Sequence, residues 1–419
     1  MTKTQQTGWR SVSIKDLGKV VAGKTPSKMN PEYWGNLLDF ITPTDFKNDS
    51  KFLPIVSRKL SEEGAAAFVR LRIPKKSILV TCIGSDMGKV AICENESVTN
   101  QQINSIIINN NFDADFVYYL LKDSYEMLRV HAEGGSTMPI INKSQFENLT
   151  LSLPPLPEQR SVAAVLSSFD DKIELLRKQN KTLEEMAQAL FKEWFVDFNF
   201  PNEKGKPYKT SGGKMVESEL GEVPEGWGVG SILDIADLIG GGTPKTSFEE
   251  YWNGNIKWLS AKDVSANSDV FILDSEKKIT DKGLLNSSTK LLPEFSTIIT
   301  ARGTVGALCI IPERMCMSQS NYAIKSRNNN DYFVYLLISS LINHLQAAAY
   351  GAVFDTITTS TFQNSHIALP SDELILDFEN VVKPMFGKLL NNNQQIQTLS
   401  SLRDKLLPRL MRGNVNFNT

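Results

Sequence analysis

The sequence predicts an α+β protein made of two tandem, pseudo-repeated domains, each followed by a long helix. Three observations support this: an internal duplication, short β-branched runs between Gly, Pro and Asn clusters, and two long stretches with apolar residues at alternating steps of three and four. We predict domain 1 over residues 1–153, a long helix over 154–198, a linker over 199–226, domain 2 over 227–370, and a second long helix over 371–419.

The duplication is clearest at the start of each domain. Residues 9–46 align without a gap to residues 227–264. Within this stretch Gly23-Lys24-Thr25-Pro26 matches Gly241-Gly242-Thr243-Pro244, and Tyr33-Trp34 matches Tyr251-Trp252; the register then continues with slips of a residue or two. The two segments are therefore predicted to be copies of one fold.

Short runs rich in β-branched residues predict the strands inside each domain. They include 77–81 and 103–108 in domain 1 and 297–300 in domain 2. Helices are expected to follow the strands at 114–130 and 331–349. Segregated strands and helices define the α+β class.

The first long helix carries a coiled-coil seam. Its apolar positions are Leu166, Phe169, Ile173, Leu176, Leu183, Ala187, Leu190 and Trp194. Asn180 occupies the remaining seam position, where a buried amide would fix the register; an exposed kink is the alternative.

The second long helix repeats the pattern less regularly. Its apolar positions are Val382, Met385, Leu389, Ile396, Leu399, Leu406 and Leu410. Pro384 is expected to kink or interrupt the first part, because proline lacks a backbone donor and clashes with the preceding turn. Two seams in one chain predict that the helices pair with each other as an antiparallel coiled coil.

Composition limits the classes of function. No run of about 18 apolar residues is apparent and the first ten residues are polar, so we expect a cytoplasmic protein. The four cysteines form no CxxC pair and the three histidines form no H-x-x-x-H pair, so no metal site is expected. The pI near 6.1 speaks against a protein that binds DNA alone.

Catalytic motifs are present only as fragments. Residues 18–25 match the phosphate-binding pattern G-x-x-x-x-G-K-[ST], but Pro26 and Pro31 follow where its helix should begin, and the second copy lacks the lysine. Glu276-Lys277-Lys278 has the E-x-K form of some nuclease sites, which is common on solvated loops. No [DN]-P-P-[YF] motif of an adenine methyltransferase is present. We therefore predict no catalytic residue and no cofactor in this chain.

Several motifs together resemble the specificity subunits of type I restriction-modification enzymes. They are Leu153-Pro154-Pro155-Leu156-Pro157-Glu158-Gln159-Arg160 ahead of the first long helix, Ser218 to Trp227 ahead of domain 2, and the paired Gly-x-Thr-Pro and Tyr-Trp elements. The resemblance covers essentially the whole chain. One departure is that the second helix begins with Pro370-Ser371-Asp372-Glu373, so its partner contacts are expected to be less typical.

The resemblance implies two target-recognition domains that read double-stranded DNA. It also implies partners: two modification subunits that methylate adenine with S-adenosylmethionine, and two restriction subunits that use ATP and Mg to translocate and cut. The exposed helix faces that carry Lys172, Arg177, Lys178, Lys181 and Glu184 are where those partners could dock. Two unlike domains on rigid helices imply a two-part asymmetric site, with an unread gap set by helix length.

Loops with both phosphate-binding and base-reading side chains are needed in each domain. In domain 1 the candidates are Lys24, Thr25, Lys28, Thr44, Asp45, Lys47, Ser85, Lys89, Gln101, Gln102, Ser136 and Thr137. In domain 2 they are Thr243, Lys245, Ser260, Lys262, Asp263, Arg302, Thr304, Gln319, Asn321 and Tyr350. Arg302 and the Gln and Asn side chains are favoured for base contacts, because their planar donors match guanine and adenine edges.

Two other functions remain as alternatives. A stand-alone two-headed DNA-binding regulator should be basic, unlike this chain. A self-contained methyltransferase or nuclease lacks its motifs. The target sequence itself does not follow from the residues.

Overall fold

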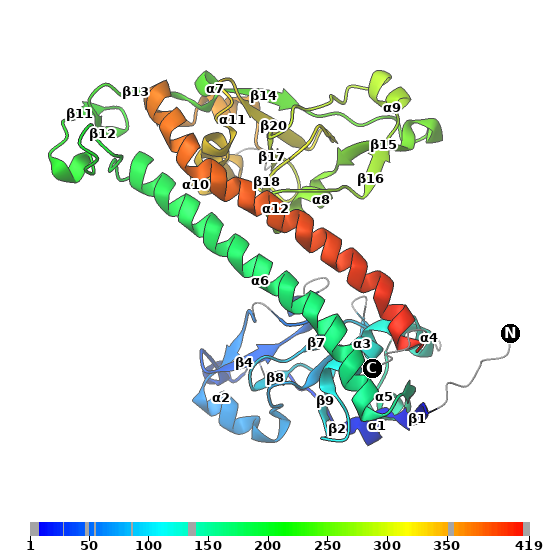
Figure 1. Cartoon of the computed structure of the whole chain (residues 1–419). Coiled ribbons are helices and arrows are strands. Elements are labelled where there is room, and N and C mark those ends of the chain that lie inside the picture. Colours follow the sequence, from blue (N-terminus) through cyan, green and yellow to red (C-terminus); the bar gives the residue numbers. More distant parts are fainter. Residues whose placement is uncertain are drawn as a thin grey trace. The chain divides into compact units, whose positions relative to one another are not determined.

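The computed structural model describes residues 8–27, 29–46, 50–53, 56–84, 87–132, 140–350 and 356–413. The chain divides into two compact units, Met1–Glu174 with Thr398–Thr419 (unit 1) and Leu175–Gln397 (unit 2). Each unit contains one of the predicted domains and a part of each long helix. Figure 1 shows the elements coloured along the chain.

Unit 1 contains domain 1. Its elements are β1 Arg10–Ser13, α1 Ile14–Leu17, β2 Gly18–Ala22, β3 Trp34–Gly35, β4 Leu38–Ile41, β5 Lys59–Leu60, α2 Glu62–Ala67, β6 Ile78–Thr81, β7 Val90–Ile92, β8 Ser97–Thr99, β9 Ile103–Ile108, α3 Ala114–Asp123, α4 Tyr125–Ala132, α5 Lys143–Asn148 and β10 Thr150–Leu153. They form one sheet in the order β2-β9-β6-β7, a second in the order β3-β5-β4-β8, and the pair β1-β10.

Unit 2 contains domain 2. Its elements are β11 Met215–Ser218, β12 Gly221–Pro224, β13 Gly228–Ser231, α7 Ile232–Ile235, β14 Ala236–Gly240, β15 Trp252–Leu259, α8 Ala261–Ala266, β16 Lys277–Ile279, α9 Asp281–Leu285, β17 Thr297–Thr300, β18 Leu308–Ile310, β19 Cys316–Met317, β20 Asn321–Ser326, α10 Asp331–Tyr350, α11 Thr359–Gln363 and β21 His366–Leu369. The sheets have the orders β14-β20-β17-β18, β16-β15-β19 and β13-β21.

The two topologies match except that the single strand β15 stands where domain 1 has the separate strands β3 and β4, which confirms the predicted duplication and the α+β class. The sheets β2-β9-β6-β7 and β14-β20-β17-β18 are antiparallel, and the other sheet of each domain contains one parallel pair, β4 with β8 and β15 with β19. The first and last strands of each domain pair with each other. The described residues therefore contain two copies of one fold.

Alternation along the central strand explains why the four-stranded sheet is buried on both faces. In β6, Ile78 and Val80 belong to the core that includes α3, whereas Leu79 belongs to the core on the opposite face. In β17, Ile299 packs in the core with α10 and Ile298 in the opposite one. Because neighbouring side chains of a strand point to opposite faces, an unbroken apolar run suits this position.

Helix α10 is the one described helix that is long and apolar enough to cross a membrane. Half of the tested window is buried inside the protein, and Phe333, Leu336 and Ile338 belong to the core of domain 2. A core helix passes the same length and composition test, so the observation is weak evidence for a membrane span. The sequence pattern had not singled out this segment as a possible span.

The two long helices are α6, Leu156–Phe195, and α12, Asp372–Met411. Helix α6 lies within the predicted range 154–198, and α12 begins one residue after the predicted start at 371 and ends at Met411. The expectation that Pro384 interrupts the second helix is wrong, because α12 runs through it. Pro384 lies on the exposed face, where water can bind the carbonyl that loses its partner. The burial of Phe378, Val382 and Phe386 stabilises the helical turns on either side of Pro384.

The predicted linker, residues 199–226, has regular structure. It contains the hairpin β11-β12, and the ring of Phe200 stacks between Tyr208, 4.6 Å away, and Trp227, 5.5 Å away. The Tyr208 hydroxyl donates a hydrogen bond to the Lys214 carbonyl at 2.8 Å. This connection is therefore a packed segment, and its Gly, Lys and Pro content had indicated only a linker.

Each long helix caps a helix of the domain that precedes it. In unit 1 the buried Gln159 of α6 accepts a hydrogen bond from the Asp113 amide at 3.0 Å, and it donates one to the Pro154 carbonyl at 2.8 Å. In unit 2 the buried Glu379 of α12 accepts from the Tyr332 and Phe333 amides at 3.2 and 2.8 Å. Glu379 thus serves the role of Gln159, although α12 lacks the Pro-Glu-Gln-Arg motif.

Within each unit, parts of α6 and α12 are in contact. In unit 2 the Asn180 side chain is buried, donates to Asn393 Oδ1 at 2.5 Å and accepts from Asn392 Nδ2 at 2.8 Å. Phe191 and Phe378 pack edge to face. In unit 1 Arg403 donates to Asp170 Oδ1 at 2.6 Å. Asn180 is thus buried as expected, and the pairing of the whole helices as one coiled coil stays a prediction.

Candidate nucleic-acid interface

Strand pairing brings five loops of domain 1 to one edge of its sheets. Strand β2 ends at Ala22 beside Asn104, β6 ends at Thr81 beside Ile103, and β4 ends beside the end of β8. The described segments 23–27, 42–46, 82–84 with 87–89, and 99–102 leave from these points. The fifth segment contains Ile141, whose amide donates to the Cys82 carbonyl at 2.9 Å.

Domain 2 repeats this arrangement. Strand β17 ends at Thr300 beside Asn321, and β15 ends at Leu259 beside Met317. The Ala301 amide donates to the Ser320 carbonyl at 2.8 Å, and the Ile357 amide donates to the Ala301 carbonyl at 3.1 Å. The predicted DNA-contact residues that the structure describes lie, in both domains, on or next to these converging loops.

A threonine and a glutamine join two of the loops in each domain. In domain 1 Thr25 Oγ1 donates a hydrogen bond to Gln101 Oε1 at 2.6 Å. In domain 2 Thr243 makes the same bond to Gln319. Both glutamines are exposed and both threonines are half-buried. Sequence reasoning named all four residues but did not predict that they pair.

Glycine is required where these two loops meet. A Cβ atom on Gly23 would lie 2.1 Å from the Asn100 carbonyl oxygen, and one on Gly241 would lie 2.1 Å from the Ser318 carbonyl oxygen. Such distances are far below van der Waals contact, so a side chain there would separate the loops. The glycine of the Gly-x-Thr-Pro element thus holds the threonine against the loop that carries the glutamine.

The predicted contact residues differ in their exposure to solvent. The exposed ones are Lys24, Thr44, Gln101, Lys245, Lys262, Arg302, Thr304 and Gln319; the half-buried ones are Thr25, Lys89, Gln102, Thr243, Ser260 and Asp263. Lys262 pairs with Glu276 at 3.0 Å, and the side-chain bond between them raises the pKa of Lys262. Lys28, Lys47, Ser85, Ser136 and Thr137 lie outside the described residues, as does the side chain of Tyr350.

Two candidates must be corrected, because the structure gives them an internal role. Asp45 is 3% exposed, and its carboxylate accepts bonds from the Thr42 amide and from the amide and hydroxyl of Ser57. Asn321 is 1% exposed and donates to the Leu259 carbonyl at 3.2 Å. Neither side chain has surface for a base or a phosphate.

The half-buried Asp263 is also engaged within its loop. Its carboxylate accepts from the Ser260 amide at 2.8 Å and from the Glu276 amide at 2.9 Å. Ser260 in turn is the N-cap of α8 and accepts from the Asp263 amide. This is a reciprocal capping box, which explains the Ser-x-x-Asp spacing without a ligand.

Sequence reasoning missed a cation that lies over a tryptophan in each domain. The guanidinium carbon of Arg58 lies 3.7 Å from the centre of the Trp34 ring, and Lys277 Nζ lies 5.6 Å from that of Trp252. Both cations are exposed and occupy equivalent places, since Leu60 and Ile279 pair with the two tryptophans. The duplicated sequence could have revealed them, because a basic pair precedes each of these apolar residues.

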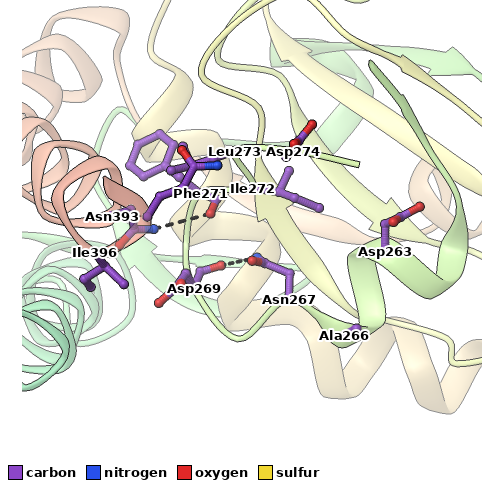
Figure 2. Close-up of a pocket in the computed structure, with 11 residues that line it drawn as sticks. Asp263, Ala266, Asn267, Asp269, Phe271, Ile272, Leu273, Asp274, Asn393 and Ile396 are labelled. Atoms are coloured by element: carbon purple, nitrogen blue, oxygen red, sulfur yellow. Dashed lines mark hydrogen bonds between the residues drawn. The ribbon is translucent and has the colours of Figure 1, made fainter. Parts of the chain in front are cut away.

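Figure 2 shows an open pocket of unit 2. It has a volume of about 330 Å³ and is lined by Asp263, Asp269 and Asp274 on the domain side and by Asn393 and Ile396 of α12. Burial raises the pKa of Asp269, whereas Arg177 lowers it. Asn393 donates to the Phe271 carbonyl at 3.3 Å. Three acidic side chains repel phosphate, so this pocket does not suit the DNA backbone.

The described residues contain no group of three or more His, Cys, Asp or Glu side chains arranged to hold a metal ion. All four cysteines are buried free thiols. The residues that converge at the loop edges are mainly amides, hydroxyls and cations, which suit a polyanion with hydrogen-bonding edges.

Comparison with known proteins agrees with this geometry. The family model for the type I restriction modification DNA specificity domain matches residues 6–185 and 224–378. The chain is 32% identical to the type I restriction enzyme MjaIX specificity subunit of Methanocaldococcus jannaschii, over 97% of this chain and 93% of that protein. It is 26% identical to the HindI specificity subunit of Haemophilus influenzae, over 97% and 99%.

A solved structure shares the fold. The crystal structure of the type I restriction-modification S subunit from M. genitalium aligns with a TM-score of 0.59 at 16% identity and covers 98% of each chain. Together with the duplicated family match, this confirms the resemblance found in the motifs. The chain belongs to the type I restriction-modification DNA specificity family, whose members are the DNA-recognition subunits of these systems and not their catalytic ones.

Proposed function

We propose that this chain selects a two-part, asymmetric DNA site, in which domain 1 reads one half and domain 2 the other. The observation that carries the proposal is that each domain gathers the same set of loops at one sheet edge, with different side chains on them. Arg302, for example, follows β17 where Ile83 follows β6. Unlike side chains on a shared frame are what two different half-sites require.

The long helices would set the separation between the two halves. Each is 40 residues long and spans about 60 Å at about 1.5 Å per residue. Buried polar contacts within each unit, such as Asn180 with Asn393, favour one register of the helices. A fixed register would give a fixed unread gap.

The chemistry would be performed by partner subunits in the cytoplasm. We propose two modification subunits that bind S-adenosylmethionine and methylate adenine, and two restriction subunits that use ATP and Mg. An adenine must leave the base stack to be methylated, which suits a division between a chain that selects the site and chains that hold the flipped base. The exposed Lys172, Lys178 and Lys181 of α6 are available for docking.

Methyl transfer from labelled S-adenosylmethionine to DNA tests the proposal. The purified chain alone should transfer no methyl groups, and adding the modification subunit should produce methylated adenine within one asymmetric two-part sequence. Methyl transfer by the chain alone, or methylation without a sequence preference in the presence of both proteins, would contradict it.

A change of helix length tests the spacer. Inserting one heptad into both α6 and α12 keeps the seam and adds about 10 Å. The unread gap should lengthen by about three base pairs, at about 3.4 Å each, with both half-sites unchanged. Insertion into α6 alone is the control and should abolish methylation. An unchanged gap in the methylation map of the double insertion would rule the spacer out.

A further inference from the structure

We propose that the two Thr–Gln pairs, Thr25 with Gln101 and Thr243 with Gln319, are equivalent anchors that bind the DNA backbone. In this role each glutamine amide donates to a phosphate oxygen and takes no part in reading base identity. The inference rests on the proposed function and goes beyond it, because it separates the residues that place each domain on DNA from those that read the sequence.

The first step of the argument is the equivalence of the two pairs. Both join the Gly-x-Thr-Pro loop to the loop before β9 or β20, with the same donor and the same acceptor atom. Both are held by a glycine whose missing side chain allows close approach, and both are followed by a buried proline. The geometry is therefore built into the shared fold.

The second step is that each glutamine exposes its side-chain amide. The threonine hydroxyl donates to Oε1, which orients the side-chain amide of an exposed glutamine and leaves its Nε2 group to donate outward. Fixing the rotamer before binding lowers the entropic cost of ordering a long side chain at an interface. Threonine is thus a positioning residue and glutamine the group that touches DNA.

The third step concerns which contacts can distinguish the two half-sites. The half-sites of an asymmetric sequence differ in their bases but share the sugar-phosphate backbone. A side chain that is identical and identically held in both domains cannot report a difference between the half-sites, whereas it can bind what they share. Bases are then read at equivalent positions where the two domains carry different residues. Examples are Arg302 in domain 2, where domain 1 has Ile83, and Lys89 in domain 1, where domain 2 has Ala307.

This assignment revises one expectation from the sequence. The glutamines were favoured for base contacts because their planar amide matches an adenine edge. Their equivalence in the two domains, which the structure places at matching loop junctions, outweighs that chemical match. Arg302 keeps its assignment as a base reader, since it is exposed and domain 1 has Ile83 at the equivalent position.

The test uses the complex of this chain with its modification subunits and duplexes carrying the site found by methylation mapping. Gln101→Ala and Gln319→Ala should each weaken binding about three- to tenfold, the range of one neutral hydrogen bond. The loss should be equal for the cognate duplex and for every single-mismatch duplex. The slope of affinity against salt should not change, because a neutral amide displaces no counterion.

Arg302→Ala is the matched control and should instead relax discrimination at one base pair of one half-site. Thr25→Val should weaken binding as Gln101→Ala does, and Thr25→Ser, which keeps the hydroxyl, should restore it. Thermal unfolding of every variant separates these effects from loss of folded protein. A merely structural threonine would lower the unfolding temperature without this pattern of rescue.

A neutral methylphosphonate, scanned through the phosphates of each half-site, identifies the acceptor. At one position in each half it should remove the difference between the wild-type complex and the glutamine variant. Relaxed discrimination at a base pair in Gln101→Ala, or an unchanged affinity, would overturn the inference. A wild-type complex that methylates no two-part site would refute the proposed function instead, and that result is seen before any variant is made.

Discussion

The buried guanidinium of Arg403 is an unusual residue for the inside of unit 1. Its side chain is 1% exposed and pairs with Asp170, 3% exposed, and with Asp404 at 2.9 Å. The Tyr119 hydroxyl donates to the other oxygen of Asp170 at 2.5 Å. The charge is therefore compensated inside the core, at the contact between α6 and α12 in this unit.

Asp170→Asn should destabilise unit 1 strongly. It removes the buried carboxylate that pairs with Arg403, and breaking such a pair costs about 3 kcal/mol or more of unfolding free energy. Urea denaturation of the chain measures the effect. Lys178→Ala, at an exposed position of the same helix, is the control and should change stability by less than about 0.5 kcal/mol.

A double replacement distinguishes a structural role from a specific need for charge. Asp170→Leu with Arg403→Met should recover part of the lost stability, because apolar residues of similar volume replace buried ion pairs well, whereas the Tyr119 hydroxyl loses its acceptor. If Asp170→Asn proves as stable as the wild type, the ion pair contributes nothing and the account is wrong.

The carboxyl of Glu379 predicts a pH dependence for unit 2. Burial raises the pKa of Glu379 to about 7 from its ordinary value of 4.5, although the amides of Phe333 and Tyr332 lower it. A raised carboxyl pKa means that the folded protein binds the proton more tightly than the unfolded chain. The resulting stability is present below pH 4.5 and is lost as the pH rises through 7.

The unfolding free energy should therefore fall by about 3 kcal/mol between pH 4.5 and 7.5 from this group alone. Chemical denaturation across that range measures it, and Glu379→Gln should flatten the difference. Glu373→Gln, at an exposed position of the same helix, is the control and should keep the slope of the wild type. An identical slope in Glu379→Gln would contradict the raised pKa.

At the scale of elements, apolar periodicity located the long helices, and β-branched runs located the central strands. Burial of one helix face leaves a repeating pattern in the sequence, and burial of a strand on both faces leaves an unbroken apolar run. The sheets β3-β5-β4-β8 and β16-β15-β19 were not predicted, because most of their strands have only two or three residues, which is too short to show a period. Their pairing depends on residues far apart in the chain.

Helix α12 tolerates a proline at a cost that can be measured. Pro384→Ala should raise the unfolding free energy by about 1 to 3 kcal/mol, because an interior proline costs about 3 kcal/mol relative to alanine. Gly387→Ala, where an added Cβ meets no atom within 4 Å, should gain about 1 kcal/mol. Both are read from thermal unfolding. A loss of stability in Pro384→Ala would show that α12 depends on the proline.

At the scale of the whole molecule, charge sets how the chain binds DNA. Its formal net charge is -2, so its affinity for DNA must come from local groups such as Arg58 and Arg302. We expect the chain alone to bind weakly and the complex with modification subunits at least about tenfold more tightly at 150 mM salt. Fluorescence anisotropy with a labelled duplex measures both.

The opposite result would favour the alternative function. Tight, site-specific binding by the chain alone, unchanged when the partner is added, is the behaviour of a stand-alone regulator. Arg302→Ala is the control that links either result to the proposed interface, since it should weaken specific binding in both cases.

The sequence by itself determined the duplication, the two domains, the two long helices and the family. Each of these can be recognised from a local motif or from a repeat. It also named the chemistry of the exposed loop residues, since Lys, Arg and Gln keep their polar ends in water wherever the loop lies. It could not tell which candidates are buried. Asp45 and Asn321 look like contact residues until strand pairing encloses them.

Only the tertiary structure decided which loops meet, because that depends on the pairing of strands distant in the chain. It joined Thr25 to Gln101 and Thr243 to Gln319, and it placed Arg58 over Trp34. It also showed Glu379 in the role of Gln159, which no motif had indicated. Hydrogen bonds between distant residues leave no period in a sequence, and this is the physical reason that they had to be observed.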